Sequence, residues 1–578
     1  MTQGKLGVLF ILFAIAAGYY IMHSTSREAM MLFINGIVYT LDANNTVAQA
    51  VAISGNRIVG VGTNDEITSH FISDNIIDLQ GKTIIPGLID GHCHVLGEGS
   101  ALHNIDLVGT GSADDVAEIV RKRVQEFQSG QWMYGRGWDQ NDWDVKEFPD
   151  NILLDRVAPD NPVYLTRIDG HAVWVNSKAM DLAGIIPETP DPEGGKILRD
   201  AQGKPTGVFV DNAVDLIAKA IPQLTDEDVE QRLKLAFNEC VKLGLTEVHD
   251  MGVDLQTIRI YKKLIDNGEC PIRVYAVIGG PRETGKAYIE SGTDVPAETW
   301  NTYLKIGKEI GYGNGLLTVR AVKLYADGAL GSRGAALIDS YSDDPGNRGL
   351  TVSSESDLET ICRQAAENGF QVSIHAIGDR GNNIVLNVYE KVLQSYAHAT
   401  SPRWRVEHVQ VLAPEDISRF ARLDVIPSMQ PTHATSDMYW AEVRLGRERV
   451  KGAYAWRSLL QHGSIIVGGS DFPVEGVNPL WGIYAAATRS DKSGYPEDGW
   501  YSQQKMTREE AVRSFTSWAA YGSFEENMKG TIETGKWADL TILSKDIMQV
   551  PARDILTTDV EMTLVAGKVV YKKSPIAQ

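Results

Sequence analysis

The stretch Ile84-Ile-Pro-Gly-Leu-Ile-Asp-Gly-His-Cys-His94 ends a strand-like apolar run with two histidines. Residues i and i+2 of a strand point to the same side, so His92 and His94 can bind one cation together. Cys93 points to the opposite side, where we expect it to pack as a small hydrophobic residue. The stretch therefore predicts a strand that ends in a pair of metal ligands.

Polar residues close four later apolar runs in the same way, namely Lys323, His375, His408 and Asp471. Imidazole and carboxylate groups are ligands that suit zinc or a similar divalent ion, and the lack of paired thiolates argues against a structural zinc site. A single histidine of this kind is more often a hydrogen-bonded core residue. Four histidines and an aspartate at equivalent positions instead favour a catalytic site for one or two metal ions.

Apolar runs alternate with helical patterns through most of the chain, which is typical of a parallel βα architecture. Seven runs follow the strand that ends at His94, and eight parallel strands predict an α/β fold with a closed, TIM-type (β/α)8 barrel. Active sites of such barrels lie at the carboxyl ends of the strands, so we expect the six polar residues to converge there. The seven runs are 245–249, 272–278, 319–324, 371–375, 404–408, 425–429 and 464–469.

The length of 578 residues predicts one large domain with smaller parts attached. Residues 31–86 and 526–578 both show short strand patterns, and because a few isolated strands are marginal, we expect the two chain ends to pair into one small β-sandwich. Residues 87–525 make up the predicted barrel. Within them, 112–224 is left over as an inserted, lid-like segment after the first strand.

The N-terminal segment 1–30 is different in kind, because residues 6–22 form an unbroken apolar run. Seventeen residues are at the short limit for spanning a bilayer and slightly long for the core of a signal peptide. An uncleaved signal anchor is favoured over a cleaved signal peptide, and both over a buried helix. The protein is expected to be exported, either membrane-anchored and facing the periplasmic or extracellular side, or secreted or periplasmic after cleavage.

Charge and cysteine content exclude several classes of protein. The formal net charge of −20 and the pI near 5.1 argue against a nucleic-acid partner, which needs basic residues to neutralise phosphates. The four cysteines are far apart and form no CxxC pair, so neither a disulfide framework nor a thiolate metal site is expected. The sequence gives no indication of oligomeric state.

Lys323 differs chemically from the other five residues. An ammonium group is a donor with no lone pair and repels cations, so this lysine can join a metal site only after it is neutralised. A desolvated lysine near metals is able to react with carbon dioxide and form a carbamate, whose two oxygens bridge two ions. The alternative is an ordinary lysine of the barrel interior, paired with a carboxylate such as Asp327.

The combined motifs resemble those of the amidohydrolase superfamily, specifically the YtcJ-like amidohydrolase family 3 that also contains N-substituted formamide deformylase. The resemblance covers residues 31 to about 573, and the N-terminal apolar segment is extra. The matching stretches are 86–94, Val322-Lys-Leu-Tyr-Ala-Asp-Gly-Ala-Leu-Gly-Ser-Arg333, His375-Ala-Ile-Gly-Asp379, Arg405-Val-Glu-His408, Gly469-Ser-Asp-Phe-Pro-Val474, 167–177 and 535–540.

This resemblance implies a hydrolase that cleaves the carbon–nitrogen bond of a small amide or formamide-type molecule. In such an enzyme His92, His94 and Asp471 hold one divalent metal ion, His375 and His408 hold the other, and carboxylated Lys323 bridges them. The ligand types favour zinc. Asp471 then acts as general base and acid. The candidate substrate contacts are Arg136, Trp138, His171, Asp327 and Arg333.

Two alternatives to an amidohydrolase remain open. An ester or lactone hydrolase on the same site is possible, since hydrolytic attack does not depend on a nitrogen leaving group. A membrane-tethered binding or regulatory protein without turnover is the other, and the loss of a ligand residue would be its sign. No ligand position departs from the family pattern.

Overall fold

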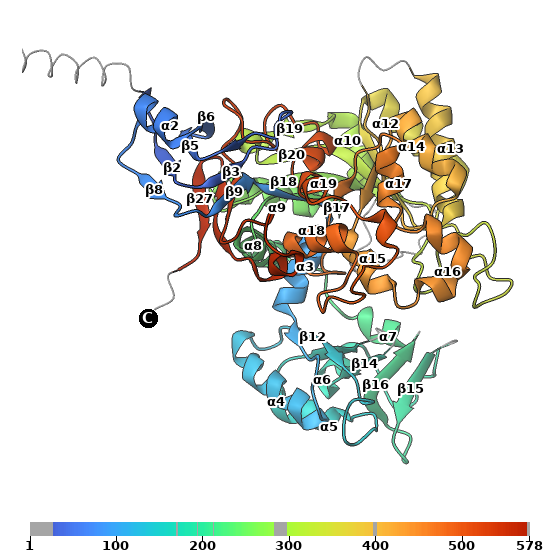
Figure 1. Ribbon diagram of the computed structural model, residues 1–578. Helices are drawn as coiled ribbons and strands as arrows, with labels where there is room; N and C mark the ends of the chain where they lie inside the picture. The colour runs from blue at the N-terminus through green and yellow to red at the C-terminus, as the bar shows by residue number, and fades with distance from the viewer. Residues whose placement is uncertain are drawn as a thin grey trace, which may run out of the picture. The chain divides into compact units, whose positions relative to one another are not determined.

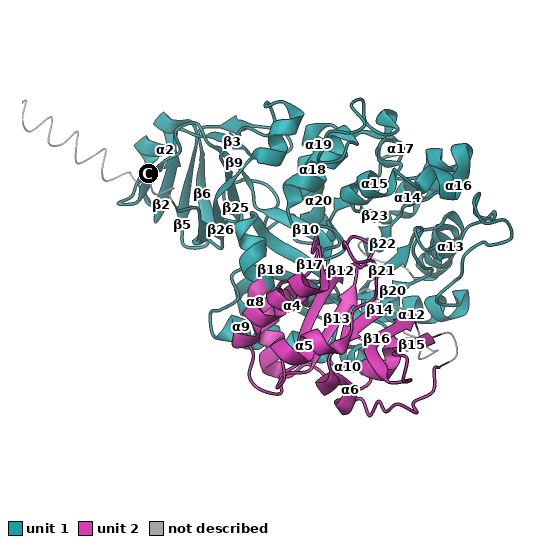
Figure 2. Cartoon of the chain, turned by 90° about the horizontal axis from the view of Figure 1, so that it is seen from below, with its two compact units in different colours: residues 1–97, 236–578 teal, residues 98–235 magenta. Residues whose placement is uncertain are grey.

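The structure, a computed structural model, describes residues 27–168, 172–192, 195–211, 213–281, 297–396 and 401–574 (Figure 1). These residues divide into two compact units, one of residues 1–97 and 236–578 and the other of residues 98–235 (Figure 2). No helix in the described ranges is long and apolar enough to span a bilayer. The apolar segment 6–22 and the candidate contact His171 lie outside the described residues.

The first unit is built on a sheet of eight parallel strands, with the short antiparallel strand β19 (Glu309–Gly311) added to one of them. The neighbouring parallel strands are, in order, β10 (Leu88–Cys93), β17 (Leu245–Val253), β18 (Arg273–Gly279), β20 (Leu317–Tyr325), β21 (Gln371–Ala376), β22 (Arg405–His408), β23 (Ile426–Met429) and β24 (Val467–Gly468). Their order follows the chain, as a singly wound barrel requires. The predicted (β/α)8 barrel and all eight of its strands are confirmed.

The barrel is nearly closed by the chain that follows β24. The backbone N–H of Asp471 donates to the carbonyl of His92 (2.8 Å), and the N–H of His94 donates to the carbonyl of Phe472 (2.9 Å). The first strand is therefore bonded both to β17 and to the segment after the last strand. This seam brings the two ends of the barrel sequence to one place at the carboxyl edge.

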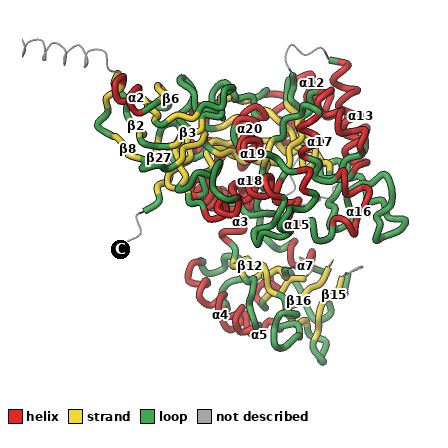
Figure 3. Tube along the Cα trace, viewed as in Figure 1, coloured by secondary structure: helices red, strands yellow, loops and turns green. Residues whose placement is uncertain are grey.

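Helices separate the barrel strands along the chain, and they are drawn red in Figure 3. Glu355–Asn368 shows why such a segment is helical: the Ser354 side chain caps the first turn, and Gly369 ends the helix at a φ of 68°. The helices are α8 (Asp226–Lys242), α9 (Leu255–Asp266), α10 (Ala297–Ile306), α12 (Glu355–Asn368), α13 (Asp379–Ser395), α14 (Pro414–Leu423), α15 (Pro431–Asp437), α16 (Ala441–Arg449), α17 (Trp456–Gln461), α18 (Pro479–Thr488), α19 (Arg508–Ser514) and α20 (Ser517–Gly522).

Both chain ends form a small β-sandwich next to the barrel, as the sequence predicts. One sheet has the order β6 (Arg57–Gly62), β5 (Ala50–Ser54), β2 (Met31–Ile34) and β8 (Ile76–Asp78). The other has the order β27 (Lys568–Lys572), β26 (Val560–Val565), β25 (Leu540–Leu543), β9 (Thr83–Pro86), β3 (Ile37–Tyr39) and β4 (Val47–Ala48). Phe33 and Val51 from the first sheet share one apolar core with Ile84, Leu540 and Leu564 from the second. Neither chain end could bury this surface alone.

The second unit is an α/β domain with a sheet of its own. Its strands have the order β11 (Ile105–Asp106), β12 (Met133–Trp138), β13 (Val163–Arg167), β14 (Ala172–Val175), β16 (Pro205–Asp211) and β15 (Gly195–Arg199). The first three are parallel and the others pair antiparallel. The helices α4 (Ala113–Arg123), α5 (Asn151–Val157), α6 (Ser177–Leu182) and α7 (Val214–Ala218) accompany the sheet. A lid function for the inserted segment 112–224 stays a prediction.

Candidate metal centre

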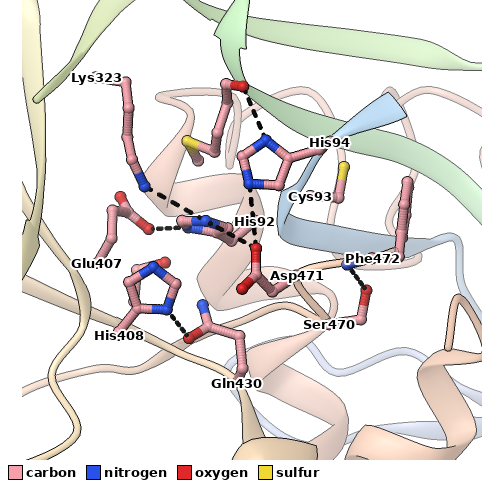
Figure 4. A network of polar contacts seen from close by, with 12 residues as sticks. His92, Cys93, His94, Lys323, Glu407, His408, Gln430, Ser470, Asp471 and Phe472 are labelled. Atoms are coloured by element: carbon pink, nitrogen blue, oxygen red, sulfur yellow. Dashed lines mark hydrogen bonds and ion pairs between the residues drawn. The ribbon is translucent and has the colours of Figure 1, made fainter. Parts of the chain in front are cut away.

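The structure brings the six polar residues that close apolar runs to the carboxyl edge of the barrel. They lie in or directly after β10, β20, β21, β22 and β24, and the side chains are at most 3% exposed. The set is His92, His94, Lys323, His375, His408 and Asp471 (Figure 4 labels all of them except His375). Their convergence follows from the common direction of the strands.

Asp471 is the centre of the group. Its Oδ1 lies 3.2 Å from His94 Nε2 and 3.4 Å from His92 Nε2. Lys323 Nζ approaches the same His92 nitrogen at 3.5 Å, so the lysine reaches the group from β20. The dashed lines in Figure 4 follow these contacts.

Two further imidazoles complete the cluster. The ring of His408 lies 4.7 Å from that of His92 and 4.5 Å from that of His375. Among the described residues, the potential ligand atoms of His92, His408 and Asp471 all lie within 4.8 Å of one another and could hold a metal ion. A buried carboxylate among imidazoles is a donor set that suits a divalent transition metal.

The Nδ1 atoms of three of these histidines have acceptors that fix the ring. His92 Nδ1 lies 2.6 Å from Glu407 Oε2, His94 Nδ1 lies 3.1 Å from the Met251 carbonyl, and His408 Nδ1 lies 2.9 Å from Gln430 Oε1. Each Nδ1–H therefore donates outwards, which leaves the Nε2 lone pair for the centre of the cluster. Metal-binding histidines are commonly oriented in this way, so the residues fit a bound cation.

Electrostatics keep His408 and Asp471 in the protonation states of metal ligands. Burial, together with the neighbouring imidazoles of His375 and His92, holds the pKa of His408 well below its usual value. Burial alone raises the pKa of the Asp471 carboxyl, but the contacts with His92 and His94 outweigh it and hold that pKa well below the usual range. A neutral imidazole and an ionised carboxylate are the forms that bind a metal.

Glu407, which the sequence did not single out, orients His92. Its carboxylate is fully buried and lies 2.8 Å from Arg405 Nε. Although burial raises the pKa of Glu407, the charge of Arg405 and the hydrogen bond from His92 hold it far below its ordinary value. A signal was present in the sequence, because Arg405 and Glu407 place two charges on one face of a strand that is otherwise apolar.

Asp90 and Ser470 hold the barrel seam beside the metal ligands. Asp90 Oδ1 accepts a bond from the His92 N–H (3.0 Å), and Asp90 Oδ2 accepts from the Ser470 hydroxyl (2.6 Å) and the Ser470 N–H (3.1 Å). Burial raises the pKa of Asp90 to about 6. This carboxylate thereby fixes the first strand against the loop that carries Asp471.

Asp327, a candidate substrate-binding residue of the first unit, is bonded to other residues of the protein. Asp327 accepts backbone N–H bonds from Ala336, Ile377 and Gly378 (2.8–2.9 Å) and lies 3.6 Å from His375 Nε2. Burial raises the pKa of Asp327 to about 7. These bonds indicate that Asp327 positions the loops around His375, and its substrate role stays a prediction.

The other candidates are placed as follows. Arg333 forms an ion pair with Asp343 (2.8 Å). Arg136 lies on the exposed side of β12 in the second unit and donates to the Ile168 carbonyl (3.3 Å). Trp138 is fully buried in the apolar core of the same unit, and its indole N–H donates to the Leu165 carbonyl (2.8 Å). The substrate roles of Arg333, Arg136 and Trp138 stay predictions.

Comparison with known proteins agrees with this geometry. The model of the amidohydrolase family matches residues 75–571. A putative amidohydrolase, YtcJ of Bacillus subtilis (strain 168), is 33% identical over 93% of this chain and 99% of its own length. The N-substituted formamide deformylase of Arthrobacter pascens is 30% identical over 94% of this chain and 98% of its own length.

A solved structure supports the same assignment. An uncharacterized metal-dependent hydrolase from Pyrococcus horikoshii OT3 superposes with a TM-score of 0.73 at 27% identity, over 90% of this chain and 99% of that one. The family match, the two full-length relatives and the buried cluster at the barrel edge agree. The chain belongs to the amidohydrolase family and is a hydrolase that acts on carbon–nitrogen bonds other than peptide bonds.

Proposed function

We propose that the protein hydrolyses the carbon–nitrogen bond of a small amide or formamide-type molecule. One observation carries the proposal: three imidazoles with outward-donating Nδ1 atoms surround the buried carboxylate of Asp471 at the carboxyl edge of the barrel. The printed name of the Arthrobacter relative, an N-substituted formamide deformylase, supports the substrate class.

The residues that would hold the metal are those of the cluster. His92, His94 and Asp471 would take one ion and His375 and His408 a second, with Lys323 between them as a carbamate. Zinc is the proposed ion, because imidazole and carboxylate donors suit it. When bound, such an ion supplies Lewis acidity towards a water molecule and a carbonyl oxygen.

Asp471 is the proposed general base and acid. Its carboxylate orients the attacking water, accepts one proton from it as the new carbon–oxygen bond forms, and returns this proton to the nitrogen as the carbon–nitrogen bond breaks. The low pKa of Asp471 keeps the carboxyl ionised and ready to accept the proton. Glu407 and Asp90 hold the neighbouring imidazole and backbone in place during these steps.

Replacement of the proposed base tests the function. Asp471→Asn keeps the size of the side chain and removes its basicity, so kcat for a formamide or amide substrate should fall by about 10³-fold or more. Asp424→Asn is the matched control, because Asp424 is an exposed residue that ends α14. Activity of Asp471→Asn within tenfold of the wild-type protein would contradict the mechanism, and paired amide and ester substrates separate an amidohydrolase from an esterase.

We also propose that the protein is exported and that residues 6–22 anchor it to a membrane unless they are cleaved. The unbroken apolar run supports this proposal. Fractionation of cells that express the full chain tests it. Recovery of the intact chain from the soluble cytosol would contradict export.

A further inference from the structure

His433 is a buried histidine at the metal centre that none of the predicted ligand positions includes. It lies in α15, which starts at Pro431 directly after β23, and it is 7% exposed. Proline at the first helical position fixes the start of this helix. The short connection therefore places His433 at the same barrel edge as the six clustered residues.

His433 faces the side of Asp471 that the other histidines leave open. Oδ1 of Asp471 lies near His92 and His94, whereas Oδ2 lies 3.6 Å from His433 Nε2. The ring of His433 is nearly parallel to that of His408, at an interplanar angle of 15° and a centroid distance of 6.0 Å. The carboxylate thus has one oxygen on the side of the ligand pair and one on the side of His433.

The Nδ1 atom of His433 has a different partner from those of the three oriented ligands. Gln410 Nε2 lies 3.2 Å from it, so this amide donates to the ring. The Gln410 amide is oriented by Tyr454, whose hydroxyl donates to Gln410 Oε1 (3.4 Å), and the Tyr454 backbone N–H donates to the Gln410 backbone carbonyl (2.7 Å). The proton of neutral His433 therefore resides on Nε2, which is opposite to the arrangement in His92, His94 and His408.

A histidine in this tautomer is a hydrogen-bond donor towards the site and not a metal ligand. Its Nε2 is buried and has no hydrogen-bond partner among the described residues, so the donor is available to a bound molecule. A buried donor of this kind is costly unless a ligand or water accepts from it. Under the proposed function the reacting group lies beside Asp471, whose Oδ2 is 3.6 Å from His433 Nε2.

We infer that His433 is a further catalytic residue that donates a hydrogen bond from Nε2 to the carbonyl oxygen of the substrate. This inference rests on the proposed hydrolytic function. The donor stabilises the negative charge that develops on that oxygen, and it needs no change of protonation. A neutral imidazole is able to polarise a carbonyl in this way, and loss of one such donor typically lowers kcat by about 10²–10³-fold.

The test compares three variants loaded with zinc. His433→Leu removes the donor, His433→Gln keeps an amide donor near the position of Nε2, and His462→Leu changes an exposed histidine at the end of α17 as a control. We expect His433→Leu to retain zinc and to lose about 10²–10³-fold in kcat with little change in KM. His433→Gln should recover part of that loss, and His462→Leu should match the wild-type protein.

Binding of acetohydroxamate gives a second readout that needs no turnover. Its carbonyl oxygen would accept from His433, so the Kd should rise about tenfold in His433→Leu and less in His433→Gln. If the zinc-loaded wild-type protein binds acetohydroxamate but hydrolyses no amide, the proposed function fails and the affinity ratio alone decides the role of His433.

Two results would overturn the inference. One is a His433→Leu variant with kcat within threefold of the wild-type value and unchanged affinity for acetohydroxamate. The other is loss of zinc from this variant, which would make His433 a ligand. If His433→Leu does not fold, Gln410→Leu replaces it, because it removes the partner of Nδ1 and leaves the imidazole intact. We then expect about a tenfold loss of kcat with zinc retained, and unchanged kcat contradicts the role.

Discussion

Both ends of the barrel contain buried polar and charged side chains, but the partners of these side chains differ between the two ends. At the amino end Arg273 forms a bidentate pair with Asp539 (2.6 and 3.0 Å), and Lys529 contacts the carboxylates of Glu247 and Glu525. Every positive group named here has an opposite charge within the protein. At the carboxyl end the imidazoles instead turn their Nε2 atoms towards Asp471 and one another. The comparison distinguishes an end built for stability from an end built to bind a cation.

A chain of polar contacts connects the two ends through the barrel interior. Beyond the bonds of Glu407 with His92 and Arg405, Arg405 Nη1 lies 3.0 Å from His249 Nδ1, and His249 Nε2 lies 3.1 Å from Glu247 Oε1. All of these side chains are buried. The orientation of a metal ligand is therefore supported by side chains that extend to the opposite end.

The largest expected effect is at the amino end, where Arg273→Ala leaves Asp539 buried without its partner. Removal of one partner of a buried ion pair typically costs about 3–5 kcal/mol, because the remaining charge is uncompensated. The melting temperature should fall clearly while the zinc content of the folded protein stays the same. Arg121→Ala is the control, since its pair with Glu118 is exposed and its loss should shift the melting temperature by little. Equal shifts in the two variants would remove the distinction between buried and exposed pairs.

Removal of metal from the carboxyl end should lower the stability of the protein by a smaller amount. A ligand at a hundredfold excess over its Kd stabilises the folded state by about 2.7 kcal/mol, so a chelator should lower the melting temperature of zinc-loaded protein. His92→Ala should have a lower melting temperature with zinc than the wild-type protein and should respond less to the chelator. A wild-type melting temperature that is independent of zinc and chelator would show that the cluster is satisfied without a cation.

The smallest expected effect is a change in metal affinity on mutation of Glu407, which belongs to the chain of polar contacts between the two ends. Glu407→Gln keeps the shape of the side chain but removes the charge that accepts from His92 Nδ1. Loss of such an orienting partner typically weakens metal binding about ten- to hundredfold. A zinc titration against a competing chelator measures the change. Gln504→Glu, at a buried position in another part of the unit, serves as a charge-change control, and equal affinity in Glu407→Gln and wild-type protein would rule out an orienting role.

The barrel was predictable because its strands are short apolar runs in an order that repeats along the chain. Each predicted run coincides with a strand to within a few residues. The second unit was much less predictable. The sequence predicts only an inserted segment at 112–224, whereas the second unit contains a sheet of six strands. Mixed pairing and short strands such as β11 depend on contacts that no local pattern records.

The clustered residues were predictable for a different reason, namely that each closes a strand and all parallel strands end at one edge. Apart from Glu407, the groups that orient them were not predictable. Met251 contributes a backbone carbonyl, which the identity of the residue does not reveal. His433 lies within a helix after β23 and closes no apolar run. The role of Trp138 could not be decided from the sequence, because a tryptophan is compatible both with a core and with a binding surface; the structure buries it in the core of the second unit.

The seam between β10 and the segment after β24 sets the time at which the site can form during synthesis. About 380 positions separate His92 from Asp471, and at about 5–20 residues per second a ribosome needs about 20–80 s to make them. Until then the nascent chain carries a pair of histidines without the carboxylate that faces them. Metal loading and barrel closure are therefore late events, and a chain released before residue 471 holds at most a fragment of the centre.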